Sequence, residues 1–255
     1  WLKSINTSSR ESRKLARLTL KNLGFHNERH YRKVLARMRD YLNVVENRMS
    51  AQEWDKINYS QVPAYAIKNY GSAFAKHDYE RWNQYLKDLQ KGTTKVNAST
   101  LYPYDLVHQY MDKYYGDSYG PNTLTEAQWK ALPDYVGDGA NVMVMADVSG
   151  SMMGRPMETS IGLAAYFAQR NHGPFAGLFL TFTDIPRYIH VRSDDKLYTM
   201  INKIRQNVGY NTNLDKAFNL ILDTALNNHV PQEDLPRALV VVSDMEIDSY
   251  VRYHG

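Results

Sequence analysis

Three short oxygen-bearing side chains follow an apolar run near the middle of the chain. The run from Asn141 to Ala146 leads directly into Asp147-Val148-Ser149-Gly150-Ser151. Magnesium prefers near-octahedral oxygen coordination at about 2.0–2.1 Å and keeps several waters, so the short side chains of a tight turn suit it better than His or Cys. The residue types therefore indicate a site for a hard divalent cation at the carboxyl end of a strand.

Two later segments supply further oxygen ligands. Thr212 lies in a polar stretch before an amphipathic segment, and Asp244 ends the apolar run that starts at Leu239. In an open, mostly parallel sheet, ligands bind outside the carboxyl ends of the strands, so loops far apart in sequence converge there. We expect all three segments to meet at one rim.

The order Asp-x-Ser-x-Ser, then Thr, then Asp resembles the metal-ion-dependent adhesion site (MIDAS) of von Willebrand factor A domains. The resemblance implies that Ser149, Ser151 and Thr212 ligate Mg²⁺ directly, while Asp147 and Asp244 hold coordinated waters. It also implies an open coordination position for a carboxylate of a partner protein, with Mn²⁺ or Ca²⁺ as alternative ions. Without the later Thr and Asp, the first motif would equally fit a helix cap and turn, because Asp and Ser satisfy free backbone N–H groups there.

Charge divides the chain into two parts. Residues 1–135 contain 21 Lys and Arg against 14 Asp and Glu, whereas residues 136–255 contain 10 against 13. A length of 255 residues also favours two domains over a single core. We therefore predict a basic domain over 1–135 and a second domain over 136–255.

The first half has the patterns of successive helices. A capping box at Ser8-x-x-Glu11 predicts one helix start, and Ser50-x-x-Glu53 predicts another. Apolar residues at helical spacing predict further helices over 31–45, near 82–89 and from Pro103 onward. Such an array predicts an α-helical, repeat-like domain.

The second half alternates short apolar runs with helical segments. Predicted strands cover 142–146, 177–182, 188–191 and 239–242, and predicted helices cover 157–169 and 214–225. This pattern is typical of an α/β, doubly wound, Rossmann-like domain. A complete von Willebrand factor A domain has further elements after the position of Asp244, so we expect this one to be truncated at its C-terminus.

Helices followed by such a domain resemble the layout of Ro ribonucleoproteins, in which a helical TROVE region precedes a von Willebrand factor A domain. Over residues 1–130 this resemblance rests on helical layout and basic charge. The stretches 1–4, 97–104 and 243–246 look more like an uncharacterised bacterial and phage family of the same two-part design. For that family the fold is implied and the biochemistry is not.

These patterns leave several functions open. The first is a non-enzymatic, metal-dependent protein that binds an acidic group of a partner. The alternative is a Ro-like RNA-binding protein that holds small or misfolded noncoding RNA on its basic helical half, where cations neutralise phosphates and tyrosines stack on bases. Its candidate residues share one helix face, although such a face is more often simply solvated: Arg29, Arg32, Lys33 and Arg37.

A third hypothesis is hydrolysis of a phosphoester with the help of the bound metal. We nevertheless expect that the protein is not an enzyme. Its candidate acids each have an ordinary explanation as a helix cap or a loop acid: Asp184, Asp215, Glu246 and Asp248. The chain has no cysteine, and no apolar segment approaches the roughly 20 residues that span a bilayer. We therefore expect a cytoplasmic protein that does not bind a membrane.

Overall fold

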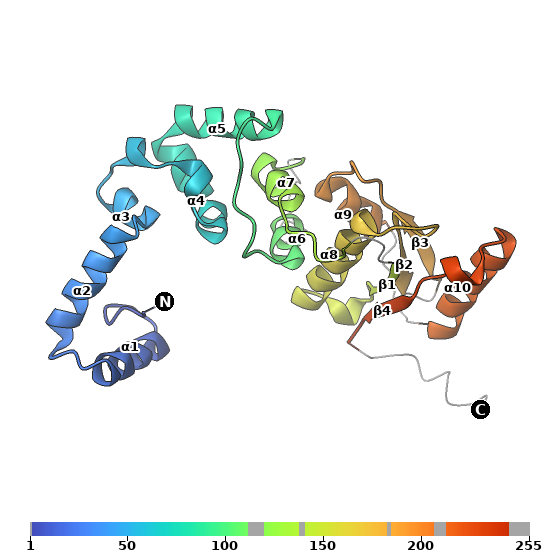
Figure 1. Ribbon diagram of the computed structural model, residues 1–255, viewed down its shortest axis with the longest axis horizontal. Helices are drawn as coiled ribbons and strands as arrows, with labels where there is room; N and C mark the ends of the chain where they lie inside the picture. Colours follow the sequence, from blue (N-terminus) through green and yellow to red (C-terminus); the bar gives the residue numbers. More distant parts are fainter. Residues whose placement is uncertain (1, 112–119, 138–140, 183–184, 207–212, 245–255) are drawn as a thin grey trace.

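The computed structural model describes residues 2–111, 120–137, 141–182, 185–206 and 213–244. Helices make up the described part of the first half, and a small sheet with its covering helices forms the second (Figure 1). The chain is thus mixed α/β, as the sequence predicts. Helices α1 to α3 lie at the end of the molecule far from the sheet, with α4 and α5 in between, so the molecule is elongated (Figure 1).

The helices of the first half are short to medium in length. In chain order they are α1 (Arg10–Asn22), α2 (Glu28–Tyr41), α3 (Val45–Ser50), α4 (Ala64–His77), α5 (Tyr79–Lys91), α6 (Pro103–Met111) and α7 (Thr123–Lys130), with 3₁₀ turns at Trp54–Lys56 and Tyr59–Gln61.

Two predicted helix starts need correction. The N-cap of α1 is Ser9, one residue after the predicted Ser8, and its hydroxyl accepts a hydrogen bond from the backbone N–H of Ser12. Ser50 ends α3 instead of opening a helix, and only a 3₁₀ turn follows Glu53. A capping pattern is local, so it can match at a position where the following backbone does not continue as a helix.

The predicted stripe over residues 31–45 is only partly buried. Tyr31 and Leu35 are buried, but Tyr41 is 90% exposed and Leu42 lies beyond the end of α2 with 58% exposed. The small cluster around Tyr31 also includes Ile5 and Ala16. Helix α2 therefore buries its first turns and leaves its last turn in solvent.

The second half contains four strands. The elements are β1 (Val142–Asp147), a 3₁₀ turn (Gly150–Met152), α8 (Arg155–Arg170), β2 (Leu178–Phe182), β3 (Arg187–His190), α9 (Leu197–Arg205), α10 (Leu214–Asn227), a 3₁₀ turn (Gln232–Asp234) and β4 (Ala238–Val242). The strand order is β3-β2-β1-β4. Strand β1 pairs in parallel with both β2 and β4, and β3 is an antiparallel edge strand.

Helices cover both faces of this sheet (Figure 1). Alternate residues of a strand point to opposite faces, and in β1 Val144 and Ala146 pack in one cluster while Met143 and Met145 pack on the other side. Val144 and Ala146 pack with residues of α8 and α9 on one face of the sheet, and Met143 and Met145 pack with residues of α10 on the other face. Both sides of β1 are therefore apolar, and the strand reads as a continuous apolar run.

Two helices of the first half share the core of the second half. Leu106 and Val107 of α6 and Trp129 of α7 belong to the same buried cluster as Ile161 of α8. The division of the chain into domains 1–135 and 136–255 stays a prediction. In the packed structure, α6 and α7 lie against the sheet-bearing part, so the helical half is anchored to it.

Helices α6 and α8 lie close together at Gly162. A Cβ placed on this glycine would lie 3.0 Å from the carbonyl carbon of Pro103 and 3.0 Å from the backbone nitrogen of Tyr104. Nearby, the ring of His108 lies with Nδ1 2.7 Å from the Glu158 carboxylate. A side chain at this position would therefore crowd the backbone at the start of α6, so glycine suits the crossing of α6 and α8.

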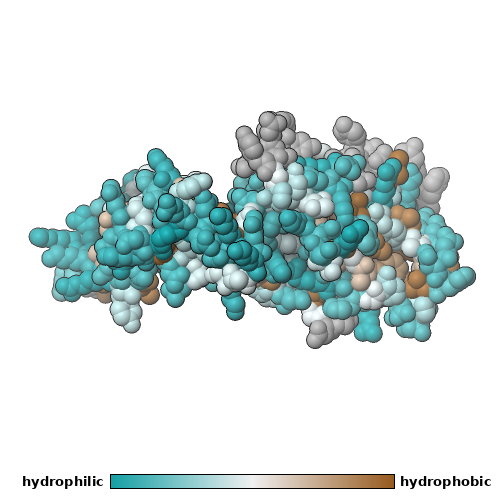
Figure 2. All heavy atoms as spheres, turned by 90° about the horizontal axis from the view of Figure 1, so that it is seen from above, coloured by the Kyte–Doolittle hydropathy of each residue, from teal (hydrophilic) through white to brown (hydrophobic). Residues whose placement is uncertain are grey.

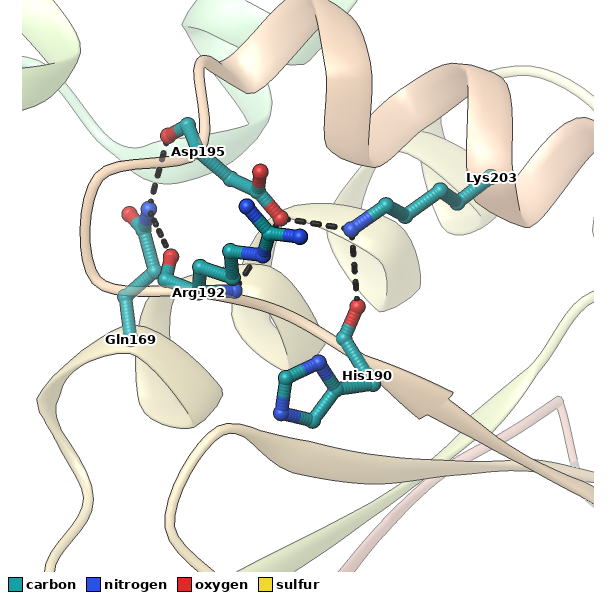
Figure 3. A network of polar contacts seen from close by, with 5 residues as sticks. All are labelled: Gln169, His190, Arg192, Asp195 and Lys203. Atoms are coloured by element: carbon teal, nitrogen blue, oxygen red, sulfur yellow. Dashed lines mark hydrogen bonds and ion pairs between the residues drawn. The ribbon is translucent and has the colours of Figure 1, made fainter.

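A polar network holds the segment between β3 and α9 (Figure 3). The Asp195 carboxylate accepts from Lys203 Nζ at 2.6 Å and from the backbone N–H of Arg192 at 3.0 Å, and Lys203 also donates to the carbonyl of His190. Burial acts to raise the pKa of Asp195, but the hydrogen bonds and charges of Lys203 and Arg192 outweigh it and hold this pKa below its ordinary value. From α8, the Gln169 amide donates to the carbonyls of Arg192 and Asp195.

The surface is mainly polar. The face in Figure 2 is largely hydrophilic, and apolar residues show mostly toward the sheet-bearing end. Within the ranges that the structure describes, no helix is long and apolar enough to cross a membrane.

Candidate metal site

The register of the sheet brings two of the predicted segments together. Asp147 is the last residue of β1, and Ala146 pairs with Val242, the last residue of β4. Because the two strands are parallel, the residues that follow them emerge at the same edge. Asp147 and Ser243 therefore lie side by side at the carboxyl ends of β1 and β4.

Hydrogen bonds fix the Asp147 carboxylate at this edge. Its Oδ1 accepts the backbone N–H of Ser149 at 2.9 Å, and its Oδ2 accepts the hydroxyl of Ser243 at 2.7 Å. The hydroxyl oxygens of Ser149 and Ser151 are 3.1 Å apart. Three of the predicted site residues are thus gathered in one small polar cluster, which we name the strand-end cluster: Asp147, Ser149, Ser151 and Ser243.

The loop after β1 has the shape that this cluster needs. Ser149 has an extended backbone conformation and precedes the 3₁₀ turn Gly150–Met152, which returns the chain so that Ser151 faces Ser149. Gly154 then adopts φ 87°, a left-handed value that favours glycine, and α8 begins at the next residue. The sequence after Asp147 therefore builds a compact turn between strand and helix.

The charge of Asp147 is deeply buried. The residue is 0% exposed, and Ser149 is 4% exposed. Burying a carboxylate is costly unless hydrogen bonds or an opposite charge compensate it. Among the described residues, its hydrogen-bond partners are the neutral groups of Ser149 and Ser243, and no lysine or arginine forms an ion pair with it. A divalent cation is a chemically suitable partner for such a carboxylate.

The remaining predicted ligands are placed as follows. Asp244 is exposed and directly follows Ser243 at the end of β4, whereas Thr212 lies outside the described residues. The segment that carries Thr212 leads into α10, whose N-cap Asn213 accepts from the backbone N–H of Lys216 at 2.9 Å. The donor set of hydroxyls and carboxylates would suit Mg²⁺, Mn²⁺ or Ca²⁺.

Ser243 is the site residue that the sequence reasoning missed. It stands between the apolar end of β4 and Asp244, and the motif assigns the ligand role at the end of that strand to the acid rather than to the serine. Its signal is its position: the first residue after a parallel strand adjacent to β1 must lie beside the end of β1.

The described structure does not bring together the acids that could support phosphoester hydrolysis. Asp215 is exposed in the first turn of α10, and Asp184, Glu246 and Asp248 lie outside the described ranges. In the part of the chain with a described structure, no group of three or more His, Asp or Glu side chains could hold a metal. The strand-end cluster differs from such groups because most of its oxygens are hydroxyls.

Large side chains border the strand-end cluster. Met153, two residues after Ser151, is 70% exposed, and the Arg155 guanidinium lies 4.4 Å from the ring centroid of Tyr104 and donates to its hydroxyl at 2.6 Å. The ring of Tyr104 stacks on Tyr102, which is exposed. Aromatic residues, Met and Arg are enriched in protein interfaces, so this rim has the composition of a contact surface.

The basic face predicted for RNA is present on α2. Arg29, Arg32, Lys33 and Arg37 are all exposed, opposite the buried Tyr31. Within the described residues, none of the four forms an ion pair.

Three tyrosines of the helical half that could stack on bases have structural partners instead. Tyr59 is buried and donates to Asp78, Tyr65 donates to Asp105, and Tyr70 donates to Glu46. Burial and the Asp78 hydrogen bond raise the pKa of Tyr59 well above its ordinary value. These contacts favour a structural role for the three tyrosines over stacking on bases.

Residues 6–140 match the family model described as Domain of unknown function (DUF2828), and residues 141–254 match a second, Domain of unknown function (DUF7788). The chain belongs to the DUF2828 family, whose model covers more than half of it. The two matched regions meet between Ala140 and Asn141, just before β1.

A named relative is "Uncharacterized protein L728" of Acanthamoeba polyphaga mimivirus. It is 32% identical over 236 residues, which is 86% of this chain and 40% of the viral protein. The chain therefore spans less than half the length of that relative. No solved structure matches the chain.

Proposed function

We propose that this protein is a non-enzymatic, metal-dependent binding protein whose strand-end cluster holds Mg²⁺ and engages an acidic group of a partner protein. The single observation that carries the proposal is the fully buried Asp147 carboxylate at the edge where β1 and β4 end, whose hydrogen-bond partners among the described residues are neutral groups. In this proposal Ser149 and Ser151 are direct ligands together with Thr212, while Asp147 and Asp244 act through water.

The strand arrangement supports the same reading. The order β3-β2-β1-β4, with an antiparallel edge strand and helices on both faces, agrees with the doubly wound pattern expected for a von Willebrand factor A-like domain. The proposed site lies where β1 and β4 end, the kind of edge at which such sheets bind ligands. Ser243 adds a hydrogen bond that orients Asp147, and groups that orient ligands in this way strengthen a metal site.

A bound Mg²⁺ would offer an open coordination position to an oxygen ligand of the partner. A carboxylate suits that position because hydroxyl ligands leave most of the ion's charge uncompensated. The exposed Met153 and the Arg155–Tyr104 pair would then supply contact area around the carboxylate. This surface fits a protein partner with an acidic side chain at the centre of its interface.

Thermal unfolding with increasing Mg²⁺ tests the metal part of the proposal. A ligand that binds only the folded state at 100 times its Kd adds about 2.7 kcal/mol, which raises the Tm of a domain this size by about 5–10 °C. Ser151→Ala should abolish most of this rise, because Ser151 is exposed and its loss should leave the fold intact. The matched control is Ser50→Ala, an exposed serine at the end of α3, which should keep the full response.

Capture of partners tests the binding part. Partners retained in Mg²⁺ should be released by a chelator and by excess of a short glutamate-containing peptide, and the Ser151→Ala protein should not retain them. Retention that survives the chelator for every partner contradicts the proposal.

RNA binding through α2 is the second candidate, and one observation favours it. Lys33, Arg37 and Tyr41 lie at i, i+4 and i+8, so they share a helix face, and the Tyr41 ring is 90% exposed. Cations beside a free aromatic ring are the components of a surface that holds single-stranded nucleic acid.

Charge removal on α2 tests this candidate. Substituting Arg32, Lys33 and Arg37 together by Gln should weaken binding of structured RNA and lower the slope of log affinity against log salt by about 2–3. The control removes equal charge from exposed positions at the end of α5 and just beyond it, by replacing Lys87, Lys91 and Lys95 with Gln. Equal salt slopes for the two variants would place any RNA surface elsewhere.

A further inference from the structure

The apolar residues of α2 follow the spacing of a coiled-coil seam. Four of them lie four, three and four positions apart along the chain: Tyr31, Leu35, Met38 and Leu42. This alternation is that of the a and d positions of a heptad repeat. Leu42 caps the helix, and its backbone N–H donates to the carbonyl of Met38 at 2.9 Å, so it keeps the helical register. The four side chains therefore form one line along α2.

The described residues cover only the first half of this line. Tyr31 and Leu35 are buried, in a cluster that includes Ile5 from the segment before α1. Met38 and Leu42, in contrast, are 44% and 58% exposed. They lie on the part of α2 that leads to α3, at the end of the molecule far from the sheet (Figure 1). We name Met38 and Leu42 the open seam.

Arginines border the open seam on both sides. Successive helix residues are about 100° apart around the axis, so Arg37 and Arg39 flank Met38. Arg39 occupies the e position of the heptad, as Arg32 does one repeat earlier. All three arginines are exposed, and in the described part of the chain none of them forms an ion pair. Asp40 lies on the opposite side of the helix, so the border of the open seam is positive.

The open seam is distinct from the helix face considered for RNA. Arg29 and Lys33 lie about 180° and 140° around the axis from Met38, on the polar side of α2. Phosphates could pair with those cations without covering Met38 or Leu42. A helix with its own apolar stripe would cover both, and acidic residues beside that stripe would meet the flanking arginines. The combination of apolar seam and basic border therefore favours a protein helix at this position.

We propose that the open seam docks an acidic amphipathic helix of a partner protein, with leucine-like residues in its seam and Glu or Asp at its e and g positions. Charges at these positions set partner choice in paired helices, and hydrogen bonds between arginine and carboxylate are among the strong ones. Tyr41, which is 90% exposed beside the open seam, adds contact area. The surface is short, so the interaction belongs with small, transient interfaces below about 1,200 Å² in total.

Binding of a labelled helical peptide to the full chain, followed by fluorescence anisotropy in the presence of a chelator, tests the proposal. The probe has about 18 residues, enough to form a helix, with Leu at the a and d positions and Glu at e and g. A matched peptide has Lys in place of each Glu. The Glu peptide should bind at least tenfold more tightly, because the Lys peptide places like charges beside the arginines.

Variants of the two helices test the location. Met38→Ser combined with Leu42→Ser should weaken binding of the Glu peptide at least tenfold, because each substitution removes apolar surface that the peptide buries. The matched control is Leu15→Ser combined with Leu18→Ser, two leucines of α1 that are each 47% exposed. This control should keep the parent affinity.

A charge variant tests the border separately and leaves the apolar residues intact. Arg39→Gln should weaken binding of the Glu peptide about threefold, the usual effect of one exposed ion pair, and should make binding less sensitive to salt. Arg29→Gln removes the same charge from the opposite side of α2 and should change the affinity less than Arg39→Gln does.

Several results would overturn the assignment. Equal affinity for the Glu and Lys peptides would exclude an acidic partner. Equal affinity of the Met38/Leu42 and Leu15/Leu18 variants for the Glu peptide would mean that the peptide binds elsewhere. Self-association of the full chain that the Met38/Leu42 substitutions abolish would assign the open seam to a second copy. The proposal does not involve the metal, so loss of peptide binding in the Ser151→Ala protein would place the peptide at the strand-end cluster instead.

Discussion

Replacing Ser243 by Ala removes the hydroxyl that donates to Asp147 Oδ2 at 2.7 Å. Asp147 is 0% exposed, so water cannot easily take the place of the lost donor. A hydrogen bond to a charged group contributes about 1.5–3 kcal/mol, and because Ser243 is only partly buried we take the lower end, about 1.5 kcal/mol. For a chain of this size that lowers the Tm by about 3–6 °C.

The same substitution should weaken Mg²⁺ binding. Groups that orient metal ligands through hydrogen bonds typically contribute about 10–100-fold to affinity, so a loss of at least tenfold is expected. Thermal unfolding and Mg²⁺ titration of the Ser243→Ala protein measure the two effects, and Ser243→Thr keeps a hydroxyl and should recover most of both. An alanine variant with unchanged Tm and unchanged Mg²⁺ affinity would refute the reasoning that Ser243 holds the Asp147 carboxylate in place.

Two further predictions concern the framework of the site. Gly162→Ala places a Cβ about 3.0 Å from the backbone at Pro103, so overpacking between α6 and α8 should cost about 1–3 kcal/mol in chemical denaturation; an unchanged midpoint would mean that α6 can move aside freely. Asp195→Asn should cost about 1 kcal/mol at neutral pH, an amount reduced because Lys203 is partly exposed. The pKa of Asp195 is lowered in the folded state, so the difference between parent and variant should be complete above the ordinary Asp value of 3.8 and disappear as the pH falls below it. A difference that persists unchanged at lower pH contradicts the role given to the Lys203 and Arg192 contacts.

The sheet-bearing part could be anticipated well from its sequence. Strands β1, β2 and β4 are mainly apolar runs, with Thr181 inside β2 and Asp147 at the end of β1, and the predicted bounds differ from the observed ones by a single residue at one end. Parallel strands buried on both faces need side chains that are apolar throughout, so the signal does not depend on alternation. The antiparallel direction of β3 could not be read, because pairing direction is decided by the path of the chain between strands.

Some helices were missed for different physical reasons. The face of α4 that packs inward includes Ala64 and Gly71, and such small residues weaken the apolar pattern even though Ile67 and Phe74 are completely buried. The sequence prediction lacks helix α9, although Leu197, Met200, Ile201 and Ile204 follow the helical spacing. Its N-terminal N–H groups are capped by Glu126, a residue distant in sequence, so no local capping signal marks its start.

Exposure was the property that the helix patterns predicted least well. Phe218 and Leu222 are apolar residues of the helix predicted over 214–225, yet they are 48% and 54% exposed. Periodicity identifies which residues share a face, but the extent of burial depends on what packs against that face. In the same way, the Asp-x-Ser-x-Ser motif identified Asp147, Ser149 and Ser151, whereas Ser243 could be found only from strand register.

The most direct test of the proposed metal site is a crystal structure of the full chain grown with Mn²⁺, analysed by anomalous diffraction. Mn²⁺ takes the place of Mg²⁺ among hard oxygen ligands and its anomalous signal identifies the ion. The account predicts a strong peak within about 2.0–2.4 Å of the hydroxyl oxygens of Ser149 and Ser151, with the Asp147 carboxylate adjacent. Ordered density for both hydroxyls without a peak at saturating Mn²⁺ would contradict it.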